Sequence, residues 1–237
     1  PDFLINRVLP RMRLTRGLWD FFTRGANPPF SRAEALGRLS RAGFAIKQEK
    51  FAGNMLCIKA ERRSAPVPAN ENGYGMIISL PRIGRDGRTF KVYKLRTMHP
   101  YSEYIQDYVY GLYSIADGGK MQNDFRVTVW GRFARQVWLD ELPMIVNILK
   151  GDIKLFGVRP LSNHYFGLYT DEIRDRRIRY KPGLLPPYYA DLPSGLDAIQ
   201  LSELRYFDSW DRNPLGTDIR YFARSIYNIF FRNARSA

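Results

Sequence analysis

The sequence predicts an α/β protein, in which a small helix-strand-strand module precedes a mixed domain that is rich in helices and carries a β-hairpin. Three observations support this class. Hydrophobic residues make up 45% of the 237 residues, as in folded domains. A capped helical pattern followed by two strand-like runs occupies residues 31–62. An alternating strand pattern on either side of a turn occupies residues 76–98, and helical patterns follow it.

The first module begins with a helix in the stretch SRAEALGRLSRAGF, residues 31–44. Ser31 is placed to cap this helix, Glu34 completes a capping box, and Gly43 suits its end. Two strand-like runs, FAIKQEKF and NMLCIKAER, follow. The unit resembles the C-terminal piece of a class I methyltransferase fold. Because no glycine-rich cofactor loop is present, we interpret it as a packing module.

Composition shifts divide the chain into three parts. Residues 1–62 hold a basic, aromatic N-terminal segment and the αββ module, and residues 63–75 are rich in Pro, Asn and Gly and form a linker. Residues 76–237 form the second domain, whose hairpin turns at Arg85-Asp86-Gly87. We expect further helices at 107–115, at 128–150 with a break at Pro143, at 169–180 and at 196–210. A short strand is expected near residues 152–157.

The charge balance predicts an anionic partner. The formal net charge is +14, which favours nucleic acid, an anionic membrane surface or a phosphorylated small molecule. No zinc-finger, helix-turn-helix or RNA-recognition pattern occurs, so we expect no nucleic-acid partner. The single cysteine, Cys57, excludes an intramolecular disulfide. No run of about 18 apolar residues suggests a spanning helix, although an anchor upstream of Pro1 is left open.

Two adjacent acids, Asp140 and Glu141, stand out among recurring cations. Such a pair before Pro143 is common at an exposed helix start, where acids complement the helix dipole. Surrounded by arginines and lysines, the same pair suits a site for a phosphorylated anion. One carboxylate could attack phosphorus while the other holds a divalent metal. Both interpretations are open from the residues alone.

Three blocks of the second domain resemble the bacterial sugar transferase family, the monotopic polyprenyl-phosphate phosphoglycosyl transferases that initiate capsule and exopolysaccharide synthesis. The blocks are FKVYKLRTM (90–98), NDFRVTVWGRFARQVWLDELPMIVNILKGDIKLFGVRPL (123–161) and RIRYKPGL (177–184). They occur in the order found in the family and cover roughly residues 75–185. Several motifs in order are more specific than one.

The resemblance implies a reaction and a set of roles. Asp140 would attack the β-phosphate of a nucleotide diphosphate sugar, expected to be a UDP-sugar, and form an aspartyl-phosphosugar as UMP leaves. Polyprenyl (undecaprenyl) phosphate would then accept the sugar phosphate. Glu141 would hold Mg²⁺ or Mn²⁺. The expected substrate-binding residues are Lys94, Arg96, Arg126, Arg132, Arg135, Arg159 and Lys181. The expected location is the cytoplasmic face of the bacterial inner membrane, with other glycan-assembly proteins as further partners.

Two motifs depart from the family pattern. GVRP stands where the family has GPRP, and KPGLLPPYY stands where it has KPGITG. The re-entrant membrane helix of the family is also not recognisable. These departures leave an alternative open, in which the chain is a non-catalytic homologue that binds nucleotide sugar or serves as a scaffold in a glycan assembly complex.

Two basic segments could contact a membrane. The N-terminal one carries Arg7, Arg11, Arg13, Arg16 and Arg24 with Trp19, Phe21 and Phe22. The C-terminal one is an amphipathic helical pattern, with Ile219, Phe222, Ile226, Ile229 and Phe230 on one face and Arg220, Arg224 and Arg235 opposite. A basic amphipathic helix is typical of a membrane interface. Packing of the C-terminal helix on the protein core is equally compatible with the pattern.

Overall fold

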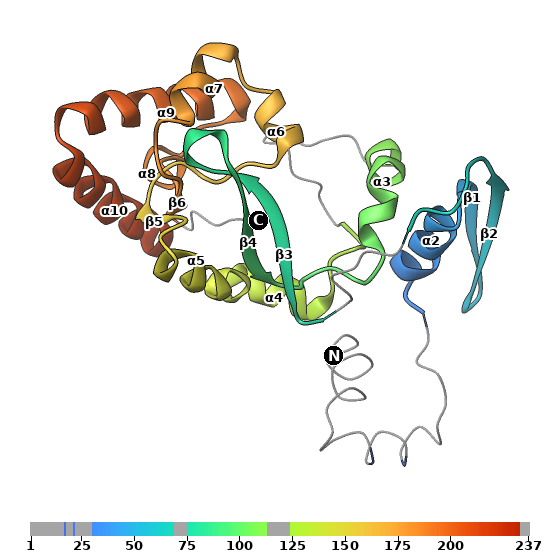
Figure 1. Ribbon diagram of the computed structural model, residues 1–237. Coiled ribbons are helices and arrows are strands. Elements are labelled where there is room, and N and C mark those ends of the chain that lie inside the picture. The colour runs from blue at the N-terminus through green and yellow to red at the C-terminus, as the bar shows by residue number, and fades with distance from the viewer. Residues whose placement is uncertain (1–16, 18–20, 22–29, 69–74, 113–123, 233–237) are drawn as a thin grey trace. The chain divides into compact units, whose positions relative to one another are not determined.

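The computed structural model describes residues 17, 21, 30–68, 75–112 and 124–232 and shows a mixed α/β protein (Figure 1). The basic segment at Arg7–Arg24, apart from residues 17 and 21, and Arg235 lie outside the described residues. The contacts divide the chain into two units. The first takes in the described residues of 1–78, 96–116 and 121–140, and the second those of 79–95 and 141–237. The α/β class with a helix-rich part and a β-hairpin is confirmed.

The predicted helix-strand-strand module is present in the first unit. Helix α2 (Arg32–Arg41) starts at Ser31, whose hydroxyl accepts a hydrogen bond from the backbone N–H of Glu34. Strands β1 (Phe44–Ala52) and β2 (Met55–Arg62) then pair antiparallel. The chain leaves the helix through Gly43, whose φ of +89° suits a residue without a side chain.

Helix α2 carries one side of a small core. Ala33 and Leu36 are buried against Ile105 and Val109. These partners come from the short 3₁₀ helix η4 (Ser102–Ile105) and from α3 (Gln106–Leu112). The first unit is therefore one packed body, and a segment that follows the hairpin in sequence closes the core of the αββ module.

The predicted hairpin is confirmed, with strands β3 (Ile77–Ile83) and β4 (Thr89–Leu95) and the 3₁₀ turn η3 (Arg85–Gly87) between them. Asp86 and Gly87 both have positive φ, at 58° and 70°. Asp is one of the few side chains that tolerate this conformation, so the Asp-Gly pair fits the turn.

The segment around the acidic pair is helical and broken, as the sequence predicts. It consists of α4 (Val129–Gln136), the 3₁₀ helix η5 (Leu139–Met144) and α5 (Ile145–Leu149). Pro143 lies inside η5, and Gly151 ends the run with a φ of +76°. The predicted short strand follows as β5 (Lys154–Phe156), which pairs in parallel with β6 (Gly183–Leu185).

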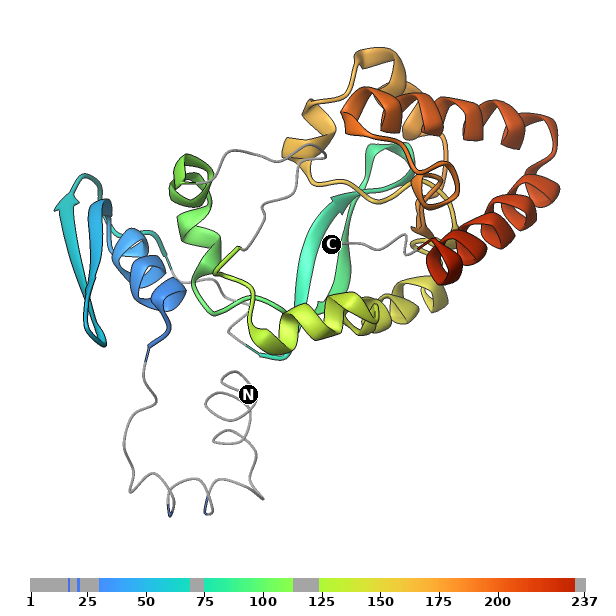
Figure 2. The same ribbon diagram turned by 180° about the vertical axis from the view of Figure 1, so that it is seen from behind.

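Helices complete the second unit. They are α6 (Asn163–Gly167), α7 (Asp171–Arg177), α8 (Tyr188–Asp191), α9 (Gly195–Arg212) and α10 (Pro214–Phe231). Figure 2 shows α9 and α10, in orange and red, as the two arms of a V. Aromatic rings fill the space beside β5: Tyr206 lies 5.4 Å from Phe156 and 5.3 Å from Tyr221, measured between ring centroids.

The burial of α10 differs from its hydropathy pattern. The buried residues are Thr217, Tyr221, Ser225 and Asn228. Ile219 and Phe230, from the apolar face that the sequence marks, are 60% and 74% exposed. The other three residues of that face, Phe222, Ile226 and Ile229, are half-buried. The most buried stripe of the helix is therefore largely polar, and its apolar face is only partly covered. No helix in the described part of the chain is long and apolar enough to cross a membrane.

Candidate active site

Glu141 is held between two cations of the second unit. The Lys94 ammonium, from β4, lies 2.6 Å from Glu141 Oε1, and the Arg159 guanidinium lies 3.6 Å from the same oxygen. The Glu141 side chain is only 13% exposed. The fold thus places Lys94 and Arg159, two of the predicted substrate-binding cations, beside Glu141, the predicted metal ligand, although the three residues are far apart in sequence.

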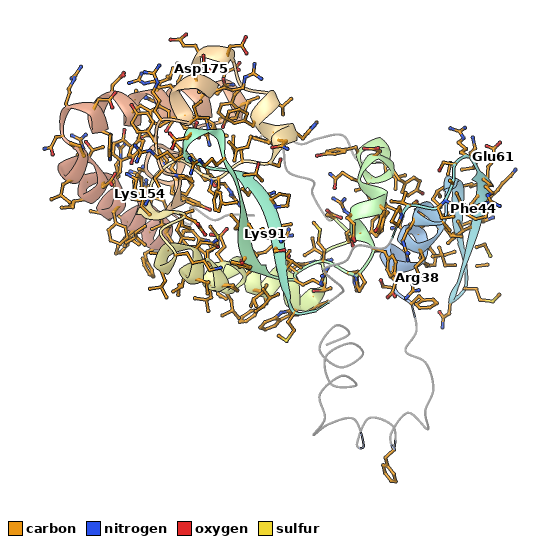
Figure 3. The ribbon with its side chains drawn as sticks, in the orientation of Figure 1. Arg38, Phe44, Glu61, Lys91, Lys154 and Asp175 are labelled. Carbon is orange, nitrogen blue, oxygen red and sulfur yellow. The ribbon has the colours of Figure 1, made fainter. Side chains whose placement is uncertain are left out.

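Asn147 fixes the distance between Lys94 and Glu141. This fully buried side chain accepts a hydrogen bond from the backbone N–H of Tyr93 at 3.1 Å and donates one to the carbonyl of Lys91 at 2.7 Å. Lys91 is labelled on β4 in Figure 3. Because Asn147 lies on α5, two turns beyond Glu141, these bonds attach the helix that follows the acid to the strand that carries Lys94.

Arg159 is held at both its side chain and its backbone. Its guanidinium donates to the Tyr188 hydroxyl at 2.6 Å, and its carbonyl accepts a hydrogen bond from Arg177. Electrostatic interaction with the Tyr188 side chain, together with the negative charge of Glu141, raises the pKa of Arg159. Arg177 is itself buried in an ion pair with Glu203. The cation at this site is therefore charged at any working pH and has little freedom to move.

Asp140 precedes Glu141 in the same 3₁₀ helix and is half-buried. It is the last residue of the first unit, and Glu141 is the first residue of the following segment of the second unit. Successive side chains of a 3₁₀ helix leave the axis about 120° apart, since the helix has three residues per turn. The two carboxylates therefore point in different directions, as separate chemical roles would require.

The other predicted substrate-binding residues are distributed over both units, and their role stays a prediction. Four belong to the first unit, and Lys181 is half-buried in the second, just before β6. Arg126 is 3% exposed and pairs with Asp124 at 2.7 Å. Arg135 donates to the Thr97 hydroxyl, Arg96 donates to the carbonyl of Gly75, and Arg132 is exposed on α4.

The donor set for a metal is small. Among the described residues, no group of three or more His, Cys, Asp or Glu side chains could hold an ion. Mg²⁺ in phosphoryl-transfer sites is commonly bound by one or two carboxylates together with substrate phosphates and water. Glu141 fits that pattern, with the phosphates of a substrate as the other ligands.

Three residues of this site were not predicted from the sequence: Asn147, Arg177 and Tyr188. Asn147 left a signal, since it is a lone polar residue in the apolar run MIVNIL. Tyr188 lies in the PPYY stretch that departs from the family motif, which marks the segment but not the role. Arg177 is one of several arginines of α7, and nothing local distinguishes it from its neighbours.

Comparisons with known proteins identify relatives of this chain. The chain is 36% identical over 134 residues to an undecaprenyl-phosphate galactose phosphotransferase of Salmonella typhimurium, covering 54% of this chain and 27% of that protein. It is 32% identical over 144 residues to the galactosyl transferase CpsE of Streptococcus agalactiae, covering 59% and 32%. It is 36% identical over 108 residues to the exopolysaccharide production protein ExoY of Sinorhizobium fredii, covering 44% and 47%.

The chain thus spans about a third or less of the first two relatives. The model of the family described as bacterial sugar transferase matches residues 65–232. That match includes the hairpin, the Asp140-Glu141 pair in η5 and both long C-terminal helices, and so covers well over half of the chain. This chain therefore belongs to the bacterial sugar transferase family.

Proposed function

We propose that this chain transfers a sugar-1-phosphate from a UDP-sugar to undecaprenyl phosphate and thereby initiates a surface polysaccharide. The observation that carries the proposal is Glu141, buried between Lys94 and Arg159 and directly following Asp140. Two relatives whose names give a substrate are called undecaprenyl-phosphate galactose phosphotransferase and UDP-galactose-lipid carrier transferase. Their names support both the acceptor and the nucleotide donor.

The proposed reaction has two steps. In the first, a carboxylate oxygen of Asp140 attacks the β-phosphorus of the donor. The bond from that phosphorus to the bridging oxygen breaks, and UMP leaves with the electron pair. In the second, a phosphate oxygen of undecaprenyl phosphate attacks the same phosphorus and releases the Asp140 carboxylate. Two displacements at one carboxylate avoid a direct encounter of two anionic substrates, and ping-pong kinetics follow.

The surrounding cations have a role in this scheme. The donor diphosphate and the leaving UMP are anionic, and Lys94 and Arg159 supply positive charge beside the acid pair. Glu141 would bind Mg²⁺ with the donor phosphates. Because Glu141 is already paired with Lys94 and Arg159, a metal bound there would share that carboxylate with the two cations. Arg126 is buried beside Asp124 in the first unit, and its predicted contact with the donor stays a prediction.

A lipid acceptor requires contact with a membrane surface. The second unit exposes apolar side chains on α5 and α10, among them Leu149 at 82%, Leu215 at 73% and Phe230 at 74%. Exposed apolar side chains on a strongly basic chain suit an anionic interface, where charge attraction and apolar burial act together. We propose peripheral binding at the cytoplasmic face, where anionic lipid and UDP-sugars are both available.

The test is UMP release from a panel of UDP-sugars, with and without undecaprenyl phosphate. The wild-type chain should release UMP continuously with the acceptor, and about one equivalent per chain without it. Asp140→Asn and Glu141→Gln should both lack turnover, and Asp140→Asn should also lack the single-turnover release. Asp175→Asn, which changes an exposed acid on α7 labelled in Figure 3, serves as the matched control.

Three results would contradict parts of the scheme. Turnover by Asp140→Asn above a few per cent of the wild-type rate would remove Asp140 as nucleophile. Continuous UMP release that never requires the acceptor would indicate hydrolysis. Binding of UDP-sugars without any UMP release under all conditions would favour the alternative of a nucleotide-sugar-binding scaffold.

A further inference from the structure

Arg82 is a half-buried cation without an acidic partner. It lies on β3, and its guanidinium donates to the carbonyl of its own neighbour Pro81 at 2.7 Å. Among the described residues, no carboxylate lies within ion-pair distance of it. Buried arginines are ordinarily paired, because removing the charge from water is otherwise costly. The position of Arg82 therefore needs an explanation other than packing.

Arg82 also lies close to another cation. Strand β3 meets the segment that carries Arg159 at an antiparallel bridge, where the N–H of Ile83 donates to the carbonyl of Leu161 at 2.9 Å. Burial, together with the positive charge of Arg159, lowers the pKa of Arg82. Both effects oppose the folded state, so the fold holds this side chain in place at a cost.

The charges around Glu141 do not balance. Arg159 and Lys94 share the single carboxylate of Glu141, and Arg82 adds a third cation next to Arg159. These side chains carry three positive charges and the negative charge of Glu141, and Asp140 adds a second negative charge one residue earlier. The cluster keeps a net positive charge, which suits an anionic phosphate group. Guanidinium groups match phosphate oxygens in geometry as well as in charge.

A small pocket lies beside Arg159, and Arg82 itself is not among the residues that line it. Ile83 and Gly84, the two residues that follow Arg82, line it together with Arg159, Val158 and Tyr180. Gly84 is buried here, and a side chain at this position would meet the ring of Phe90 at 2.9 Å. The backbone after Arg82 is thus held close to the rest of the pocket.

We propose that Arg82 and Arg159 form a pair that binds a phosphate group of a substrate. The inference rests on the proposed function, and it adds a phosphate-binding residue that lies outside the Asp140-Glu141 segment and the cations already assigned. The phosphate belongs either to the nucleotide diphosphate or to the lipid acceptor, and the same chemistry serves both.

The experiment compares Arg82→Gln and Arg82→Lys with Arg88→Gln. Arg88 is an exposed arginine of the same hairpin and provides the control. Calorimetry measures the Kd of each protein for UDP and, separately, for farnesyl phosphate, a soluble prenyl monophosphate. Loss of one charge-assisted hydrogen-bond donor should weaken phosphate binding by about tenfold or more. Arg82→Lys should lie between wild type and Arg82→Gln, and Arg88→Gln should match wild type.

The thermal stability of the ligand-free proteins separates binding from structure. Because Arg82 is desolvated and repelled by Arg159, Arg82→Gln should unfold at the wild-type temperature or above it. A structural role for Arg82 would instead lower the unfolding temperature. A lower unfolding temperature, or UDP and farnesyl phosphate affinities equal to those of Arg88→Gln, would overturn the inference.

The two ligands identify the source of the phosphate. Weaker binding of UDP alone assigns the pair to the donor, and weaker binding of farnesyl phosphate alone assigns it to the acceptor. If wild type binds farnesyl phosphate through Arg82 but does not bind UDP, the proposed UDP-sugar donor is wrong while the phosphate-binding pair stands. If wild type binds neither, both are wrong.

Discussion

Removing the Asn147 side chain should lower the unfolding free energy of the second unit and should also lower the rate of UMP release. In Asn147→Ala, the N–H of Tyr93 and the carbonyl of Lys91 both lose their partner. Each polar group left unpaired in a protein interior costs about 1–3 kcal/mol, so the two groups together should cost roughly 2–6 kcal/mol. The lower end applies if water reaches β4 in the variant.

Urea unfolding followed by far-UV circular dichroism measures this loss. Leu149→Ala is the matched control on the same helix, because Leu149 is 82% exposed and its truncation should change the unfolding free energy by no more than about 0.5 kcal/mol. Asn147→Asp keeps the oxygen that accepts from the N–H of Tyr93, but it loses the N–H group that donates to the carbonyl of Lys91. It also places a negative charge beside Asp152, whose Oδ2 lies 3.0 Å from Asn147 Nδ2.

We therefore expect Asn147→Asp to be at least as unstable as Asn147→Ala at neutral pH. UMP release should also fall in both variants at a temperature where they remain folded, because β4 carries Lys94 to Glu141. An unfolding free energy for Asn147→Ala equal to that of Leu149→Ala would refute the reasoning, since it would mean that the two hydrogen bonds from Asn147 to Tyr93 and Lys91 do not hold α5 on β4.

The remaining predictions concern the metal, acid stability and the membrane. UMP release should require Mg²⁺ or Mn²⁺, because hard cations offset diphosphate charge; undiminished turnover in excess EDTA would contradict this. The hydrogen bond from Arg32, opposed in part by burial, lowers the pKa of Glu49 below its usual 4.5. The stability that this pair contributes is therefore present above pH 4.5 and is lost as the pH falls through the lowered pKa of Glu49. Acid unfolding monitored by circular dichroism should consequently be less steep in Glu49→Gln than in wild type, and equal steepness would argue against the pair. Ile219→Ser with Phe230→Ser should weaken co-sedimentation with anionic liposomes and leave folding intact, since both side chains are exposed; unchanged co-sedimentation would place the membrane contact elsewhere.

Local sequence signals predicted most of the elements. Ser31, Glu34 and Gly43 mark both ends of α2, and the Asp-Gly pair marks the tip of the hairpin, because caps and tight turns depend on neighbours in the chain. Pro143 and Gly151 likewise mark the break and the end of the helical run around the acid pair. These signals require no knowledge of which segments meet in space.

The cation site could be predicted only in part. The motif resemblance singled out Lys94, Glu141 and Arg159, which the fold brings together. It also singled out Arg126, which the structure pairs with Asp124 two residues earlier. A list of basic residues does not show such local partners, and the substrate-binding role of Arg126 stays a prediction. Asn147 and Arg177 act across more than 15 residues of sequence, and such contacts depend on tertiary packing.

The reversed burial of α10 has a practical consequence for engineering this chain. Shortening the protein at residue 219 would remove Tyr221, Ser225 and Asn228 from the interior, so the helix cannot be treated as a detachable tail. Improved solubility should instead come from polar replacements at the apolar surface positions, of which Phe230 and Phe231 are the most exposed on α10. Conversely, the buried Ser225 hydroxyl lacks a hydrogen-bond partner among the described atoms, so alanine should be tolerated there. A mutational scan of this helix should therefore show tolerance at Phe230 and Phe231 and sensitivity at Asn228, the inverse of what hydropathy suggests at these positions.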